Sequence, residues 1–338
     1  MKNRNLVAIS YALAAAAFYA INIPCSKRLL ADVSPVFLAG LLYVGAGLGV
    51  GLMYLFRFRS ERKEDRLSRG DLPFAAGMVA LDIVAPILLM FGVKLGSSAN
   101  ASLLGNFEIV ATTLVALLLF RERVSRRLWA AILLIAASSA ILSFEGAEGL
   151  RFSVGSLFVL GATVYWGFEN NCTRRISEKS TYQIVTVKGL CSGLGSLAVS
   201  ATVGESLPPA RLVAPALLLG FVAYGLSIFA YVRAQRGLGA AKTSAYYAVA
   251  PFLGALLAFV LLGERPTARF GVALLVMAAG AALVVYDTLL RTHTHEHAHV
   301  YWHVHGGTKH AHVVVHSHPH DHILGEGRHR HRHEFADG

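Results

Sequence analysis

Charged side chains are scarce in this sequence, and their scarcity argues against a soluble protein. Only 15% of the 338 residues are Asp, Glu, Lys or Arg, against about a quarter in soluble domains, and 55% are hydrophobic. Three scattered cysteines do not make a disulfide framework. Histidine is absent before residue 293, and HExxH, GxSxG and P-loop motifs are missing. We therefore expect neither an enzyme nor a nucleotide-driven pump.

Long apolar runs fill most of the chain. A run of about 18–25 residues matches the hydrocarbon core of a bilayer, at ~1.5 Å per helical residue. We therefore predict an all-α integral membrane protein with ten transmembrane helices. These spans are 6–24, 35–56, 72–93, 98–120, 128–144, 153–171, 182–203, 212–232, 241–262 and 268–290.

The basic residues indicate how the chain crosses the membrane. A net charge of +11 can signal nucleic-acid binding, but here Lys and Arg cluster at the ends of the apolar runs, and we expect no nucleic-acid partner. If the N-terminus is cytoplasmic, the inner connections hold seventeen Lys and Arg and the outer ones seven. This bias predicts a multi-pass protein of the cytoplasmic membrane with both termini in the cytoplasm.

Two ungapped self-alignments show an internal repeat. Segment 94–123 lies over 236–265, and segment 18–29 lies over 165–176. The informative matches are charged: Glu122 falls on Glu264, Arg127 on Arg269, Lys27 on Arg174 and Arg28 on Arg175. A repeat of five helices is odd, so the two copies have opposite orientations in the membrane, as in carriers that work by alternating access.

The repeat predicts three parts. Residues 1–144 form the first five-helix repeat, 145–291 the second, inverted repeat, and 292–338 a His-rich cytoplasmic tail, which we expect to be largely disordered. The glycines of the second and seventh spans are interpreted as points of close helix packing; they are Gly45, Gly47, Gly49, Gly51, Gly189 and Gly193.

The junctions LLLFRERVSRR and FVLLGERPTAR, together with Ala241, Ser244 and Pro251 in the ninth span, resemble the EamA family of the drug/metabolite transporter superfamily. The resemblance covers residues 6–290. It implies export or exchange of small solutes such as amino acids, nucleotide-sugar-like metabolites or drugs. Ile109 stands where the family often has the counterpart of Pro251, so we expect a less kinked fourth helix.

Ionisable and polar residues inside spans are costly and are therefore candidates for function. The candidates for substrate binding or coupling are Asp82, Asn100, Asn106, Glu108, Trp166, Glu169, Lys188 and Tyr246. Asn100, Leu104 and Glu108 would share one face of a continuous helix. In the alternative interpretation, Asp82 and Glu108 hold helices together, Glu169 and Lys188 form an ion pair that only fixes packing, and Lys242 snorkels to the cytoplasmic surface.

Asp82 and Glu108 are also the candidate proton carriers. A carboxyl group in an apolar cavity can exchange a proton in the physiological range, so protons are the coupling ion that we expect. Replacement of Glu108 by Gln, followed by transport with and without a proton gradient, tests its role.

All fifteen histidines lie in the tail. Neutral imidazole binds zinc, nickel, cobalt and copper, and alternate residues of an extended chain share one side. No cofactor is required, but we expect the tail to bind one of these metals through His293, His295, His297, His299, His303, His305, His310, His312, His316, His318, His320 and His322. A short hairpin around Gly306 and Gly307 is the alternative to disorder.

Together these patterns predict a secondary transporter, an exporter or exchanger of small solutes such as amino acids or metabolites, with a metal-binding regulatory tail. Its partners are the lipid bilayer, the solute, protons and, in a homodimer, a second copy. A divalent-metal efflux carrier whose tail collects or senses the metal is the first alternative. A membrane sensor that transports nothing is the second.

Overall fold

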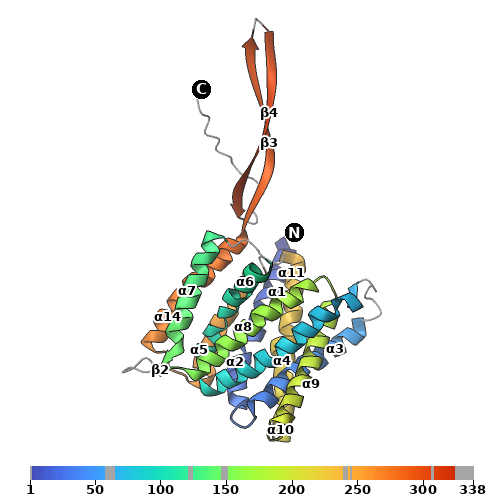
Figure 1. The fold of residues 1–338 in the computed structure, drawn as a ribbon, viewed down its shortest axis with the longest axis vertical. Helices are drawn as coiled ribbons and strands as arrows, with labels where there is room; N and C mark the ends of the chain where they lie inside the picture. The colour runs from blue at the N-terminus through green and yellow to red at the C-terminus, as the bar shows by residue number, and fades with distance from the viewer. Residues whose placement is uncertain are drawn as a thin grey trace. The chain divides into compact units, whose positions relative to one another are not determined.

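The computed structural model describes residues 2–57, 65–120, 125–145, 151–238, 243, 246–305 and 308–323, with residues 288–323 described by their backbone. The chain divides into two compact units, Met1–Val285 and Tyr286–Gly338. The first unit is the helical part of the chain (Figure 1). The second contains a two-stranded hairpin and is considered separately.

Five spans make up the first half of the helical unit. They are α1 (Lys2–Ala20) with α2 (Asn22–Leu29), α3 (Pro35–Arg57), α4 (Leu72–Leu95) preceded by the short helix η3 (Arg69–Asp71), α5 (Ser98–Leu104) with α6 (Phe107–Phe120), and α7 (Arg126–Ser143). Two short antiparallel strands, β1 (Phe144–Glu145) and β2 (Arg151–Phe152), join this half to the next.

The second half repeats the pattern. Its spans are α8 (Val154–Arg175), α9 (Thr181–Thr202), α10 (Ala210–Gly220) continued by the π-helix η4 (Phe221–Leu226) and α11 (Ser227–Leu238), α13 (Ala250–Leu262), and α14 (Ala268–Leu289). Eight described helices are long and apolar enough to cross a membrane, and α8 and α13 complete the ten. Ala241, Lys242 and Ser244, at the start of the ninth span, lie outside the described residues.

The two halves are intertwined rather than side by side. The main helix pairings are α3 with α9, α4 with α8, α1 with α11, and α5 with α13, and each joins one half to the other. The pairing of α4 with α8 joins spans three and six. Its equivalent in the other repeat is the pairing of α11 with α1, which joins spans eight and one. This is the arrangement expected for two inverted repeats around a shared centre, and α1 begins and α14 ends at the same end of the unit (Figure 1).

Glycines allow α3 to lie close against its neighbours. A Cβ atom added to Gly47 would come within 2.5 Å of the Leu190 backbone nitrogen, and one added to Gly193 within 2.6 Å of the Val44 nitrogen. Gly45 and Gly220 meet backbone carbonyl groups of α10 and α3 in the same way. The prediction that these glycines serve close packing is therefore confirmed for the α3–α9 contact.

Charged side chains complete the ends of helices. The carboxylate of Glu264 accepts hydrogen bonds from the backbone N–H groups of Ser98 (2.8 Å) and Ala99 (2.9 Å), at the start of α5. The ammonium group of Lys27 donates to the carbonyl oxygens of Val93 (2.7 Å) and Gly96 (2.8 Å), at the end of α4. Helix ends leave backbone groups without partners, and a charge of the right sign satisfies them.

The fourth span is broken, contrary to the expectation of one continuous helix. Helix α5 ends at Leu104, Gly105 and Asn106 form a turn, and α6 begins at Phe107. The N–H of Asn106 donates to the Leu103 carbonyl three residues back, at 3.2 Å, instead of four. The spacing of Asn100, Leu104 and Glu108 therefore does not place them on one helical face, and Leu104 is buried.

The second unit contains the hairpin that the sequence offers as an alternative to disorder. Strand β3 (Leu290–His305) pairs antiparallel with β4 (Thr308–Ile323), and residues 306–307 and 324–338 lie outside the described residues. The Thr, Val, Tyr and Trp residues of these strands favour extended backbone. That the tail as a whole is largely disordered stays a prediction.

Candidate functional site

An ion cluster lies in the middle of the helical unit, where α4, α8 and α9 meet. The ammonium nitrogen of Lys188 (α9) is 3.0 Å from Asp82 Oδ2 (α4) and 3.0 Å from Glu169 Oε1 (α8). Asp82 is fully buried, Glu169 is 2% exposed, and the Lys188 side chain is 17% exposed. Charges so deep in a membrane protein are stable only when they are paired, as these are.

The Asp82 carboxylate has three donors around it. Its Oδ1 accepts hydrogen bonds from the Tyr43 hydroxyl (3.0 Å) and from Trp166 Nε1 (3.2 Å), while Oδ2 faces Lys188. Pro86 lies one turn further along α4, and its missing N–H leaves the backbone carbonyl of Asp82 without its usual helical donor. The site is thus built at a point where the helix is locally weakened.

Glu169 is less firmly bound than Asp82. Its Oε1 receives both the Lys188 ammonium and a hydrogen bond from the Thr173 hydroxyl, one turn later in α8. For Oε2, no partner is recorded in the part of the chain that the structure describes. The two carboxylates therefore share one cation but differ in how many donors hold them.

A second acidic point lies beside the cluster. Glu108, in the first turn of α6, accepts a hydrogen bond from Asn170 Nδ2 at 2.7 Å, and the same amide group lies 3.1 Å from the Thr112 hydroxyl. Glu108 is close enough to Glu169 and Lys188 for their charges to act on it. The break between α5 and α6 places this carboxylate at a helix N-terminus, where negative charge is favoured.

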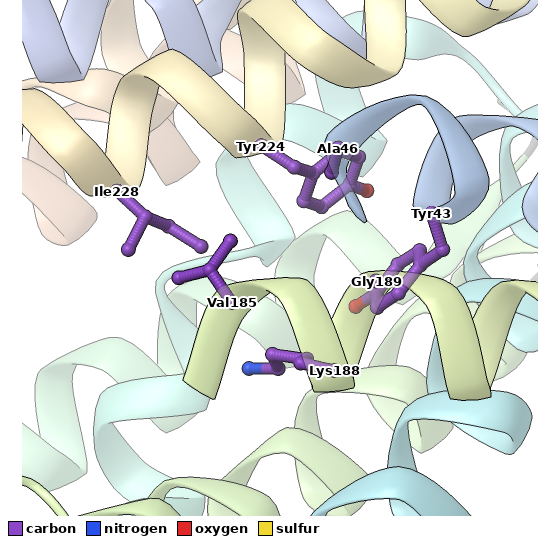
Figure 2. A pocket seen from close by; sticks show the side chains of 7 residues that line it. All are labelled: Tyr43, Ala46, Val185, Lys188, Gly189, Tyr224 and Ile228. Atoms are coloured by element: carbon purple, nitrogen blue, oxygen red, sulfur yellow. The ribbon is translucent and has the colours of Figure 1, made fainter. Parts of the chain in front are cut away.

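A small cavity opens beside Lys188. Figure 2 shows its wall: α3 supplies Tyr43 and Ala46, α9 supplies Val185, Lys188 and Gly189, and the eighth span supplies Tyr224 and Ile228. Tyr224 lies in the π-helix η4, and its hydroxyl accepts a hydrogen bond from Asn22 Nδ2 at 2.8 Å. A π-helical turn of this kind often marks a functional site.

Tyrosine rings continue from the cavity through the helical unit. The ring centres of Tyr43 and Tyr224 are 5.1 Å apart, and those of Tyr224 and Tyr19 are 6.0 Å apart. Tyr19 then contacts Tyr247 at 6.1 Å, and Tyr247 contacts Tyr231 at 5.1 Å. These distances fit favourable aromatic pairs, so five tyrosines from four spans form one connected row.

The structure brings together part of the predicted site. Asp82, Trp166, Glu169 and Lys188 form the cluster, and Glu108 lies beside it. Three other candidates lie elsewhere. Asn100 is in the first turn of α5, Asn106 bonds only locally to the Leu103 carbonyl, and Tyr246 is 37% exposed while its neighbour Tyr247 joins the tyrosine row.

Sequence reasoning missed several residues that complete the site. Tyr43, Thr173 and Asn170 bond directly to its acidic members. Tyr224 lines the cavity beside Lys188 and is bonded to Asn22. Asn22 and Asn170 carried a usable signal, because amide side chains inside apolar spans are costly. Tyr43 and Tyr224 carried none, since tyrosine is common at helix packing and at membrane interfaces.

Comparison with known proteins identifies the family. The model of the EamA-like transporter family matches residues 6–144 and 153–286, which are the two five-helix halves. The chain belongs to the EamA-like transporter family. It is therefore a multi-pass membrane transporter of the drug/metabolite transporter superfamily and not an enzyme. The junction FVLLGERPTAR, which suggested the family, contains the helix-capping Glu264.

Two individual proteins are similar to this EamA-like transporter. One, from Methanothermobacter thermautotrophicus, is described as an uncharacterized transporter and is 24% identical over 298 residues, covering 81% of this chain and 85% of its own. A solved crystal structure covers 85% of this chain and 98% of its own, with a TM-score of 0.60 and 19% identity, and supports the fold alone.

Proposed function

We propose that this chain is a secondary transporter that moves small solutes, such as amino acids or metabolites, across the cytoplasmic membrane by alternating access, with protons as the coupling ion. The observation that carries the proposal is the position of Lys188. It belongs to the second half of the repeat and is bonded equally to Asp82 of the first half and Glu169 of the second. A single cation shared by both halves is sensitive to any movement between them.

Alternating access requires a site that faces one side of the membrane and then the other. The cavity beside Lys188 is lined by spans two, seven and eight, from both halves, so a rocking of one half on the other would open it to either side. The excess of Lys and Arg at one side of the membrane supports the orientation with both termini in the cytoplasm.

Protons are the proposed coupling ion because of the charge in the site. With every group ionised, Asp82, Glu169 and Lys188 sum to one negative charge, and Glu108 adds another. A buried net charge is unfavourable and is reduced when a proton binds. Asp82, Glu108 and Glu169 are all placed to carry it.

Reconstitution into proteoliposomes tests this function. Uptake of labelled amino acids, organic acids and divalent metals is measured with and without an imposed pH gradient. Accumulation of an organic solute that follows the gradient supports the proposal. Accumulation of a divalent metal alone would favour the metal-efflux alternative, and no flux of any solute would favour a sensor. Among the described side chains, no three His, Cys, Asp or Glu gather as a metal site.

The tail is proposed as a regulatory metal site, and its strand register supports this. In the β3–β4 pair, four histidines of one strand lie directly opposite histidines of the other: His293 with His320, His295 with His318, His297 with His316 and His303 with His310. Opposed residues of an antiparallel pair lie about 4.5–5.5 Å apart, a spacing from which two imidazoles can reach one ion. Zinc, nickel, cobalt and copper are the expected metals.

Titration of the full-length protein with Zn²⁺ tests the tail. Replacing the opposed His295 and His318 by Ala should weaken binding by at least about tenfold, because the loss of an outer-shell partner of a metal ligand alone typically costs that much. Replacing His299 and His305, which face Val314 and Thr308, removes as many histidines but no pair, and should have a smaller effect. Equal effects would overturn the paired site.

The proposed homodimer is tested separately. Mass measurement of the purified protein in detergent shows whether one or two copies are present.

A further inference from the structure

The cavity presents a cation, not the carboxylates, to a solute that enters it. Lys188 lines the cavity, whereas Asp82 and Glu169 lie behind it and are 0% and 2% exposed. The remaining wall combines two tyrosines with the aliphatic side chains of Ala46, Val185 and Ile228 (Figure 2). Such a wall suits a small solute with an acidic group at one end and a short apolar body.

The size of the cavity limits what it can hold in this conformation. The space beside the Lys188 ammonium group is about that of two water molecules, which is comparable to a carboxylate group. The body of a solute is therefore admitted only when the spans around the cavity move apart. A short aliphatic amino acid or carboxylic acid requires the smallest such movement.

The two carboxylates that bind Lys188 are not equivalent. Asp82 accepts from Tyr43, Trp166 and Lys188, and protonation would weaken all three interactions. Glu169 accepts from Lys188 and Thr173, both at Oε1. Glu169 therefore loses less than Asp82 when it takes a proton, and it is the partner that Lys188 can exchange.

We propose that Lys188 is the receptor for a carboxylate group of the transported solute, and that Glu169 releases Lys188 by taking up one proton as the solute binds. This inference rests on the proposed transport function. Before binding, Asp82, Glu169 and Lys188 sum to one negative charge. After binding, a proton from water neutralises Glu169 and the solute carboxylate replaces it at the ammonium group, so the sum is unchanged. Asp82 holds Lys188 in place throughout.

Four related probes separate a carboxylate site from an amine site. Binding of valine, isovalerate, isobutylamine and valinamide to the purified full-length protein is measured by calorimetry in two buffers of different protonation enthalpy. Valine and isovalerate, which carry the carboxylate, should bind with uptake of about one proton each, and their affinity should fall about tenfold per pH unit under alkaline conditions. Isobutylamine and valinamide, which lack it, should not bind.

Substitutions test each residue separately. Lys188→Met should weaken carboxylate binding by about ten- to a hundredfold, the loss expected for a charge-assisted hydrogen bond. Glu169→Gln, which mimics the protonated acid, should bind carboxylates without proton uptake and with an affinity that no longer depends on pH. Lys94→Met and Glu178→Gln, at exposed positions, are the matched controls.

The Lys188→Met protein could fail to fold, because it leaves two buried carboxylates without their cation. The double variant Lys188→Met with Glu169→Gln keeps the net charge at minus one and should fold, yet it should not bind isovalerate. Binding of the amines, isovalerate binding by the double variant, proton uptake by Glu169→Gln, or a wild-type protein that binds none of the four probes would each overturn the proposal. The transport function would survive if proteoliposomes carry another solute.

Discussion

The centre of the helical unit contains two related half-sites, one charged and one neutral. In the ungapped alignment of 18–29 over 165–176, Tyr19, Asn22 and Ser26 correspond to Trp166, Glu169 and Thr173. The Ser26 hydroxyl donates to Asn22 Oδ1 at 3.2 Å, just as the Thr173 hydroxyl donates to Glu169. Asn22 donates a hydrogen bond to Tyr224 in the eighth span, and Trp166 donates one to Asp82 in the third span. The third span is the repeat counterpart of the eighth.

This difference separates scaffold from function. The inverted repeat supplies the same geometry twice, with a hydroxyl one turn after a polar side chain that reaches toward the opposite half. Of the two half-sites, the one with Asp82 and Glu169 has ionised carboxylates and a lysine, and the one with Asn22 and Tyr224 has neither. Charges that recur in both repeats have another role, because Lys27 and Glu264 satisfy the backbone at helix ends. The asymmetric charges are therefore the ones that we assign to coupling.

Removal of the shared cation should have the largest effect. Lys188→Met leaves Asp82 and Glu169 without their counter-ion and should lower the free energy of unfolding by about 3 kcal/mol, the low end of the cost of breaking a buried ion pair. Denaturant unfolding in mild detergent measures it, with Lys94→Met as the control. An unchanged stability would mean that the cluster is solvated and that its charges are not coupled.

A charge placed in the neutral half-site should also be costly. Asn22→Asp puts a carboxylate next to Tyr224, with no lysine at hand, and should destabilise the protein by about 2 kcal/mol, the typical penalty for a buried polar group without adequate partners. The same unfolding assay applies. If Asn22→Asp is as stable as the wild type, the neutral half-site tolerates charge and the comparison fails.

The hydroxyl groups of Thr173 and Ser26 occupy equivalent positions but should contribute differently to the free energy of unfolding. Thr173→Val removes a hydrogen bond to a carboxylate and should cost about 2 kcal/mol, whereas Ser26→Ala removes one to a neutral amide and should cost about 1 kcal/mol. The pair serves as its own control, because both donors lie one turn after their acceptor. The opposite order of stability would contradict an ionised Glu169.

The smallest effect is expected at Glu108. Its carboxylate bonds to Asn170 and does not touch Lys188, so Glu108→Gln should change the rate of transport by less than about tenfold and leave its dependence on the proton gradient intact. Proteoliposome uptake with and without the gradient measures both. Loss of the dependence would transfer the coupling role from Glu169 to Glu108.

The sequence predicted the membrane fold well because its signals are local. Apolar runs located the ten spans, most of their described ends within a few residues, and matched charges revealed the inverted repeat. Gly105 and Asn106 broke the fourth span without a proline, so the helical spacing argument for Asn100 and Glu108 was wrong. The sequence contained the turn residues, but an apolar context on both sides concealed the break.

The site was only partly predictable because its contacts are distant in sequence. Burial cost pointed to Asp82, Glu169 and Lys188 one by one, but their meeting depends on how the two halves interlock. Tyr43 and Tyr224 became visible only through that packing. The repeat alignment did pair Asn22 with Glu169. Interpreting Asn22 as the neutral counterpart of that acid would have predicted the second half-site.

Proton movement during solute flux tests the central claim most directly. Vesicles containing the transporter and a trapped pH-sensitive dye are given an outward gradient of valine, which as a zwitterion does not cross the bilayer unaided, and solute and proton fluxes are followed together. The account predicts that wild-type protein moves about one proton with each solute molecule, and that Glu169→Gln moves solute without protons. Equal proton movement in both proteins would contradict it.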